Sequence, residues 1–421
     1  MRPVTTAEIL AVGSELLTPH RIDTNSLHLT DKLNALGIDV RFKGVVGDDP
    51  DALAGAFRTA LSRADLVIST GGLGPTADDL TREAVALVLG RALLRDASVE
   101  AAIRRRFEQR RLHMPDGNLK QADVPAGGEA LPNPNGTAPG IWIAHGDQII
   151  VLLPGPPREM REIYTAHVAE RLHARTGGRQ VRRRMIRIAG RAESHVDEIA
   201  APIYTPWASS SIPIETSILA SPGQIELHLS ARGDDLPAID RALDAAVRTL
   251  AEALAPAVFS VDGRSLEAVV GELLHARNWT LAVAESCTGG LVGARLTDVP
   301  GSSVWFAGGV IAYANESKLR DLGVDAALLD RHGAVSEPVA DAMADGVRTR
   351  FATEAAISIT GIAGPDGGTP DKPVGTVAIA MRAGQARQVR TFRFAGDRQM
   401  VRQQSVIAAL EMLRQALIAP L

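Results

Sequence analysis

The chain of 421 residues contains a single cysteine, and this scarcity excludes two kinds of protein. One thiol can form neither an internal disulfide nor a cysteine-rich zinc site. The opening residues, MRPVTT, lack the apolar core of a signal peptide, and no uninterrupted apolar run approaches the ~18 residues that span a bilayer. We therefore expect a protein of the cytosol that has no membrane partner.

Aromatic residues and lysines are scarce as well. Aromatics make up 4% of the chain, which leaves few side chains for stacking on bases, and the formal net charge is −4. Proteins whose main task is to neutralise phosphate backbones are normally basic, so nucleic-acid binding is disfavoured. We interpret the arginine clusters at residues 104–111 and 182–187 as solvated faces of a helix and a strand. Only five of the 45 basic residues are lysines, which makes each lysine worth examining.

What the chain does contain is a repeated alternation of apolar runs and helical segments. At about 150 residues per domain, the length corresponds to three domains. Apolar runs at residues 9–12, 66–69 and 148–153 precede turns rich in glycine or proline. This order is typical of a parallel sheet flanked by helices, and we predict such a domain over residues 1–175.

Two further domains are predicted. Residues 176–258 combine alternating strand patterns with two helical segments, which indicates a small α+β connector domain. Residues 259–421 again place apolar runs before turns, at 281–284, 309–312 and 355–359. We therefore predict a second α/β domain there, closed by an amphipathic helix over residues 399–417.

Polar residues follow each of the three apolar runs of the last domain, at 285–290 (ESCTGG), 313–318 (YANESK) and 360–365 (TGIAGP). Because ligands bind beyond the carboxyl ends of strands in such sheets, the three segments predict one pocket. Ser286 would stand at a helix N-terminus, whose N–H groups suit an oxyanion. Lys318 is the candidate base, since burial favours its neutral form, and Tyr313 could relay or orient the proton. The pattern predicts acyl transfer from an amide.

Less specific interpretations of the same residues remain open. Taken singly, a serine in such a turn is more often a helix cap, and Lys318 a solvated surface amine. Cys287 is a rival nucleophile, although no base stands in an obvious position beside it, and it could instead pack against the sheet.

The motifs at residues 284–290, 306–318 and 360–368 closely resemble those of the CinA carboxy-terminal domain, the nicotinamide mononucleotide deamidase family. The resemblance covers residues 265–417. It implies that Ser286 is the nucleophile, Lys318 the base and Tyr313 an assisting group, with no cofactor. Ala314 departs from the family, whose members often have serine there.

The same resemblance implies a set of substrate-binding residues. The family's threonine of the third motif corresponds to Thr360, and its late arginine corresponds to either Arg398 or Arg402, between which the sequence does not choose. The full set of candidates in this domain is Thr288, Gly289, Gly290, Asn315, Thr360, Gly361, Arg398 and Arg402.

A glycine-rich segment in the first domain, residues 70–81 (TGGLGPTADDLT), lies between a strand and a helix. It lacks the Gly-Lys-Ser/Thr ending of a Walker loop. Backbone at Gly71, Gly72 and Gly74 can approach a pyrophosphate closely, and Asp78 and Asp79 could hold a divalent cation against it. Asp48 and its neighbour Asp49 precede another helix and could complete the carboxylate set. Each aspartate could equally be a helix cap.

Together with residues 13–17, 23–26, 47–49 and 153–160, this segment resembles the CinA amino-terminal domain, which is similar in fold to three-layer molybdopterin-binding proteins. The resemblance implies a metal-dependent ADP-ribose pyrophosphatase that uses Mg, Co, Mn or Ni. Asp48 and Asp79 match the acidic pair of that fold, whereas Asp78 replaces its usual arginine, which favours a metal-bound pyrophosphate over a pterin phosphate. Pro19 stands where relatives commonly have glycine.

The two resemblances predict a bifunctional enzyme of pyridine-nucleotide salvage. Its last domain would deamidate nicotinamide mononucleotide, and its first domain would cleave ADP-ribose with Asp48, Asp78 and Asp79 as metal ligands. The alternatives are a molybdopterin-binding protein and a DNA-damage-associated scaffold. From the family we also expect a homodimer.

Overall fold

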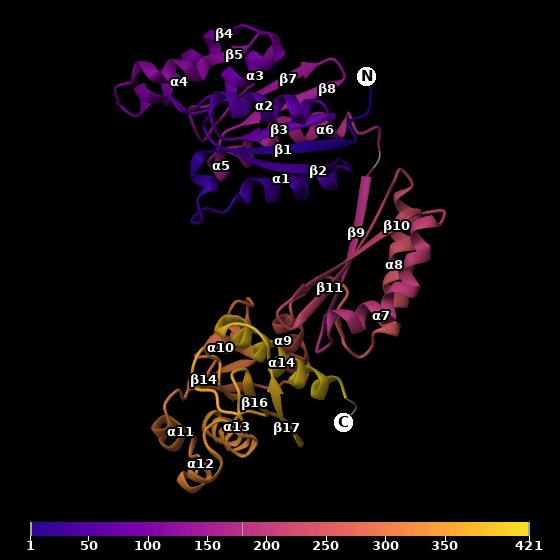
Figure 1. The fold of residues 1–421 in the computed structure, drawn as a ribbon, viewed down its shortest axis with the longest axis vertical. Helices are drawn as coiled ribbons and strands as arrows, with labels where there is room; N and C mark the ends of the chain where they lie inside the picture. The colour runs from indigo at the N-terminus through magenta and orange to yellow at the C-terminus, as the bar shows by residue number, and fades with distance from the viewer. Residues whose placement is uncertain (1, 179, 420–421) are drawn as a thin grey trace. The chain divides into compact units, whose positions relative to one another are not determined.

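The computed structural model describes residues 2–178 and 180–419. It divides the chain into two compact units: Met1–Arg182 with Arg232–Ile239, and Arg183–Ala231 with Asp240–Leu421. Figure 1 shows the helices and strands of each unit along the chain. Among the described residues, no helix is long and apolar enough to cross a membrane.

The first unit is built on a six-stranded sheet of order β2-β1-β3-β8-β7-β6. The first four strands in this order are parallel, and β7 and β6 join antiparallel at one edge. The predicted apolar runs are β1, β3 and β8, whereas β6 and β7 were not foreseen. The strands are β1 (Thr6–Val12), β2 (Asp39–Val46), β3 (Leu66–Thr70), β6 (Gly128–Leu131), β7 (Gly140–His145) and β8 (Gln148–Leu153).

Helices cover both faces of this sheet, which makes the predicted three layers. One face packs against Leu29 and Leu33 of α1, and the other packs against Leu53 and Phe57 of α2. Both faces are apolar because β3 and β8 are buried almost throughout, as expected for central parallel strands. The remaining elements are α1 (Thr24–Ala35), α2 (Pro50–Leu61), α3 (Thr81–Leu89), β4 (Leu93–Arg95), α4 (Ala97–Gln109), β5 (Asp123–Pro125), α5 (Pro157–Ile163) and α6 (Ala169–His173).

The connector region contains a four-stranded sheet of order β10-β11-β9-β12, with α7 and α8 along it (Figure 1). Strand β10 was not predicted. Ile214 is the only buried residue of this strand, and its sequence shows little hydrophobic alternation. Strand β12 extends the sheet to Ser260, two residues past the predicted domain boundary at residue 258. The domain boundaries themselves stay predictions. The elements are β9 (Gln180–Ala189), α7 (Glu193–Tyr204), β10 (Ile214–Ser221), β11 (Gln224–Gly233), α8 (Leu236–Ala253) and β12 (Val258–Ser260).

The last sheet has the order β14-β13-β15-β16-β17. Strands β14, β13 and β15 are parallel, and β16 and β17 extend the sheet as an antiparallel hairpin that was not predicted. Its elements are α9 (Leu266–His275), β13 (Leu281–Glu285), α10 (Leu291–Thr297), β14 (Phe306–Ile311), α11 (Asn315–Leu322), α12 (Ala326–His332), α13 (Glu337–Phe351), β15 (Ala355–Gly361), β16 (Thr376–Ala383), β17 (Ala386–Arg393) and α14 (Arg398–Ile418).

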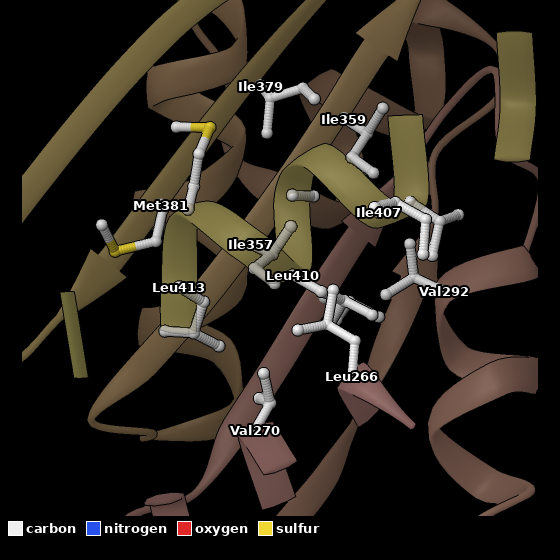
Figure 2. Close-up of a cluster of buried hydrophobic side chains, with 14 of the residues drawn as sticks. Leu266, Val270, Val292, Ile357, Ile359, Ile379, Met381, Ile407, Leu410 and Leu413 are labelled. Atoms are coloured by element: carbon white, nitrogen blue, oxygen red, sulfur yellow. The ribbon is translucent and has the colours of Figure 1, made fainter. Parts of the chain in front are cut away.

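Helix α14 corrects one prediction, because it is not amphipathic. Its apolar side chains pack on the sheet, and Figure 2 shows Ile407, Leu410 and Leu413 beside those of β15 and β16. Residues 409–414 are all buried, so every side of the helix is covered there. Glu411 and Arg414 are among these residues, and Arg414 Nη2 donates to the carbonyl of Pro256 at 2.6 Å. A helix enclosed on several faces carries no single polar stripe.

Candidate functional site

Strands β13, β14 and β15 are parallel, so their carboxyl ends meet at one edge of the last sheet. Glu285 is the final residue of β13, and its side chain is 2% exposed. Its carboxylate accepts hydrogen bonds from the backbone N–H groups of Gly290, Val292 and Gly293, at 2.9–3.1 Å. Glu285 therefore occupies the N-terminus of α10. The expectation that these helix donors face a ligand was wrong, because a buried carboxylate already uses them.

The turn after Glu285 presents Ser286 and leaves other donors available. Gly289 and Gly290 have φ angles of 57° and 93°, the left-handed region that favours glycine. The Ser286 N–H donates to Ile359 O at 2.9 Å, which ties the turn to β15. The N–H groups of Cys287 and Thr288 donate to no other residue in the described part of the chain. The Thr288 hydroxyl is also buried without a partner there. These groups are the polar atoms that a ligand at Ser286 could meet.

Lys318 lies in α11 and reaches back to the serine. Its side chain is 1% exposed, and its Nζ lies 3.2 Å from Ser286 Oγ. The same nitrogen donates to the carbonyls of Ala312 at 2.8 Å and Tyr313 at 3.2 Å. Burial lowers the pKa of Lys318 below its ordinary value. Lys318 is therefore not a solvated surface amine, and the structure brings it into contact with the predicted nucleophile.

Cys287 lies beside Ser286 but faces the core. It is 6% exposed and belongs to the apolar cluster between the last sheet and α14. Burial raises the pKa of the Cys287 thiol to about 11. Since the thiolate is the reactive form of cysteine, this thiol is a poor nucleophile near neutral pH. The packing interpretation of Cys287 agrees with this environment.

Tyr313 and the two candidate arginines link the three motifs. The hydroxyl of Tyr313 accepts from Arg398 Nη2 at 2.9 Å, and Arg398 Nη1 donates to Gly364 O at 2.7 Å. Arg402 Nη2 donates to Thr288 O at 2.7 Å. It is the carbonyl of Tyr313, rather than its hydroxyl, that contacts Lys318. Both arginines contact the site, so the structure does not choose between them.

The other predicted binding residues occupy different positions around this edge. Thr360 is 1% exposed, and its hydroxyl donates to Ala334 O at 2.9 Å, so it supports a neighbouring loop. Gly361 has no room for a side chain, because a Cβ would crowd Val377. Asn315 is exposed at the start of α11, and Ala314 is the N-cap there without a side-chain hydrogen bond.

The six residues predicted for the first domain all line one cavity of about 500 Å³. It lies at the carboxyl ends of β1, β2, β3 and β8, which are parallel neighbours in the sheet. Four residues that sequence reasoning did not assign also line it with ionisable side chains. The predicted residues are Asp48, Gly71, Gly72, Gly74, Asp78 and Asp79, and the additional ones are Glu15, Arg106, Arg110 and Glu159.

The glycine-rich loop needs its glycines for local reasons. Gly71 has a φ of 106°, and a Cβ there would collide with Val12 O. The loop is also held from behind: the buried guanidinium of Arg82 donates to Leu73 O at 2.7 Å and Gly74 O at 3.0 Å. Lys120, one of the few lysines, donates from Nζ to the carbonyls of Thr76 and Asp79, at 2.9 and 2.8 Å. The loop is thus a preformed wall of the cavity.

The carboxylates of this cavity do not form an assembled metal centre. Asp49 caps α2 by accepting from Ala52 N–H, as its alternative interpretation expected. Asp48 accepts from Ser14 N–H and Asp79 from Thr76 N–H. No group of three or more His, Cys, Asp or Glu side chains within the described ranges could hold an ion. The oxygen donors suit a hard divalent cation in chemistry, but they are not gathered around one point.

The interpretation of residues 104–111 as a solvated helix face holds in part. The arginines at 104, 105, 110 and 111 are exposed, but Arg106 is half-buried, and both Arg106 and Arg110 line the cavity. Arg106 lies on α4 and Arg110, four residues later, is its C-cap residue, so both reach the same side of the helix. Arg106 also donates to Pro134 O at 3.0 Å, in a loop that sequence reasoning passed over. The four-residue spacing of the two arginines indicated that they share one side of the helix. Only the facing loop at Pro134 shows that this side lines the cavity.

Comparison with known proteins identifies the family of this chain. Residues 263–417 match the family model of the CinA C-terminal domain, and residues 8–174 match that of a probable molybdopterin binding domain. A CinA-like protein of Koribacter versatilis is 46% identical over 417 residues, covering 98% of this chain and all of that protein. The chain belongs to the CinA family.

Further CinA proteins are similar over all or part of the chain. A CinA-like protein of Acidobacterium capsulatum is 45% identical over 416 residues, covering 98% of this chain and 100% of that protein. The solved structure of CinA from Thermoplasma acidophilum is 37% identical, with a TM-score of 0.38, and covers 40% of this chain and 98% of that chain. The two family models and the two CinA-like relatives confirm the family predicted from the motifs, and with it the mixed α/β fold with a molybdopterin-binding-like first domain.

Proposed function

We propose that this CinA-family protein is an amidohydrolase whose last domain converts nicotinamide mononucleotide and water to nicotinic acid mononucleotide and ammonia. The observation that carries the proposal is the 3.2 Å separation of Lys318 Nζ and Ser286 Oγ at a buried position. A serine becomes a strong nucleophile only when a neighbouring base removes its proton. Lys318 is the base in contact with it.

The contacts of Lys318 suit the neutral amine. A neutral amine has two N–H bonds and one lone pair, and the carbonyls of Ala312 and Tyr313 offer two acceptors. The lone pair then remains for the Ser286 hydroxyl proton. Burial favours the same protonation state, because removing a lone ammonium from water is costly.

The proposed reaction proceeds in two halves. Ser286 Oγ attacks the carboxamide carbon while its proton passes to Lys318 Nζ. Lys318 then protonates the departing nitrogen, the C–N bond breaks, and ammonia leaves an acyl-serine ester. A water molecule attacks the ester carbon with Lys318 again accepting the proton, and the C–O bond to Ser286 breaks as the proton returns to Oγ. Every proton taken from a nucleophile is thus delivered to a leaving group.

The oxyanion of each tetrahedral intermediate needs fixed donors. The N–H groups of Cys287 and Thr288 are the available ones, because Glu285 uses those of α10. Tyr313, held by Arg398, stands at the exposed side of the site, where the substrate enters. We assign the arginines to the phosphate of the nucleotide, since guanidinium groups pair well with phosphates.

Ammonia release from nicotinamide mononucleotide tests this proposal, with wild-type protein and Ser286→Ala in the presence of a chelator. We expect activity in the wild type only. Cys287→Ala is the matched control and should retain most activity, because it removes only the thiol, which packs in the core, and keeps the Cys287 N–H. If Ser286→Ala stays active while Cys287→Ala does not, the nucleophile is wrongly assigned. If the chelator abolishes deamidation, the expected independence from metal is wrong.

We propose as a second function that the first domain hydrolyses ADP-ribose to AMP and ribose 5-phosphate. The supporting observation is that Asp48, Asp78 and Asp79 share one cavity with the glycine-rich loop and two arginines. These carboxylates would have to gather around a divalent ion as it binds, and the ion would then supply activated water and offset phosphate charge. Arg106 and Arg110 would offset further charge on the pyrophosphate. Product formation should require Mg, Mn, Co or Ni, and metal-independent cleavage would contradict the proposal.

A further inference from the structure

A second cavity, of about 750 Å³, adjoins the glycine-rich-loop cavity of the first domain. We call the two the phosphate cavity and the side cavity. They share the wall residues Arg106, Gly136 and Thr137, so they are direct neighbours. Each volume lies within the range of about 300–1,000 Å³ that is usual for small-molecule sites.

The linings of the two cavities differ in chemistry. The phosphate cavity has carboxylates and glycine backbone. The side cavity is lined by more apolar side chains, namely Val99, Ala102, Ile103, Ala130, Pro132, Pro134 and Pro139, alongside the charged Asp96, Arg105 and Glu129. Apolar side chains do not favour the binding of a charged phosphate, but they favour the binding of an uncharged ring because its surface is removed from water. Polar groups are also present, such as Gln109 and His167, which can meet the edge nitrogens of such a ring.

Arg106 stands at the boundary of the two cavities with unused hydrogen-bonding capacity. Its Nη1 donates to Pro134 O, while its Nε is buried and has no partner among residues 2–178 or 180–419. A buried donor without an acceptor costs free energy, and a ligand that supplies an acceptor removes this cost. A phosphate oxygen beside the shared wall would do so.

The loop between the cavities is already built. The Asn133 side chain donates to Ala138 O and Glu159 Oε2, each at 2.7 Å, and accepts from the N–H groups of Asn135 and Gly136. A Cβ at Gly136 would collide with Glu159. The shared wall therefore has one defined course, and the side cavity does not depend on a ligand to form.

We infer that the two cavities hold one elongated ligand, with its phosphates beside the glycine-rich loop and a flat, uncharged nitrogen heterocycle in the side cavity. The inference rests on the proposed phosphate chemistry of the first cavity and goes beyond it by placing the ring. Two sources of such a ring fit this chemistry: the adenine of ADP-ribose and a phosphorylated pterin. The Kd values of the two ligands in wild type and in an Ala102→Trp variant distinguish them.

The experiment narrows the side cavity alone. Ala102 is exposed on α4 and lines only the side cavity, so Ala102→Trp fills it without touching the core. The neighbouring Ala101 is also exposed and lines neither cavity, which makes Ala101→Trp the matched control. Calorimetry on the full chain with Mg²⁺ measures Kd for pyrophosphate, for a phosphorylated pterin and for an ADP-ribose whose bridging oxygen is replaced by methylene.

We expect Ala102→Trp to raise the Kd of one ring-bearing ligand by about tenfold or more, while pyrophosphate stays within about twofold and Ala101→Trp changes neither. Equal effects on pyrophosphate and the ring-bearing ligand, no effect on either, or binding of neither ring-bearing ligand would overturn the inference. If only the pterin responds and the wild type does not cleave ADP-ribose, the ring placement stands and the ADP-ribose function fails. If ADP-ribose is cleaved but its analogue is insensitive to Ala102→Trp, the function stands and the ring placement fails.

Discussion

The two sites of this CinA-family protein differ in how far they are assembled by the chain alone. In the last domain, Ser286 and Lys318 are already in contact. In the first domain, Asp48, Asp78 and Asp79 share a cavity without converging on one point, and Asp48 and Asp79 are engaged by backbone N–H groups. Side chains that react with each other must be packed together by the fold, whereas carboxylates that bind an ion can gather when the ion arrives. The proposed deamidation therefore depends on the chain alone, whereas the proposed cleavage of ADP-ribose also depends on a bound ion.

The largest expected effect comes from removing the base of the assembled site. Lys318→Met keeps a long apolar stem in the buried position but has no lone pair for the serine proton. Deamidation should fall about 10³-fold or more, while ADP-ribose cleavage stays unchanged. Ammonia release and AMP formation measure the two. If both activities fall together, the separation of the two sites is wrong, and circular dichroism shows whether the variant is folded.

Glu285→Gln tests the positioning of the nucleophile turn. A glutamine offers one acceptor oxygen where the carboxylate accepts three backbone N–H bonds, so the turn that carries Ser286 should shift. We expect kcat for deamidation to fall about 100-fold with a smaller change in KM, since small misplacements of reacting groups are costly. The exposed Asp330→Asn is the control. An equal loss for both variants would show that the effect is not specific to this cap.

The pH dependence of deamidation should report Lys318. Burial lowers its pKa, so the amine is neutral at pH values where ordinary lysines are charged. As pH falls below that lowered pKa, kcat/KM should fall about tenfold per pH unit, or about 100-fold over two units. Between the lowered pKa and the ordinary lysine value, the unfolded chain binds the extra proton, so stability should rise with pH. A kcat/KM for deamidation that does not change with pH would exclude Lys318 as the base.

Arg106→Gln tests the shared wall of the first domain. We expect KM for ADP-ribose to rise about tenfold with little change in deamidation, because one charge-assisted hydrogen bond is lost. Arg104→Gln is the matched control, since Arg104 lies on the same helix, pairs with Glu100 and lines neither cavity. Equal effects of the two substitutions would indicate a general effect of charge on α4.

The smallest expected effect is a stabilisation at the entrance of the assembled site. Ala314 is the N-cap of α11 and provides no side-chain hydrogen bond. Ala314→Ser should raise the free energy of unfolding by about 0.5–1 kcal/mol, because a serine hydroxyl satisfies one of the helix's free N–H groups. Thermal unfolding measures it. A lower Tm, or a large change in deamidation, would mean that position 314 does more than cap the helix.

Much of the fold and of both candidate sites could be predicted from local patterns. The apolar runs at β1, β3, β8, β13 and β15 identified buried parallel strands, because such strands are apolar on both faces. Polar residues directly after them then had to meet at one sheet edge. Strand β10 and the β16–β17 hairpin were missed, and α14 was wrongly expected to be amphipathic, because their burial depends on what packs against them.

By itself, the sequence determined the family, the parallel sheets and the residues that gather at each edge. These features follow from short apolar runs and from glycines whose backbone angles no other residue adopts easily. Only the tertiary structure decided that Glu285 occupies the α10 donors, that Lys318 is buried against Ser286, and that Arg106 lines two neighbouring cavities. Each of these depends on which distant segment faces a side chain, and local pattern carries no information about that.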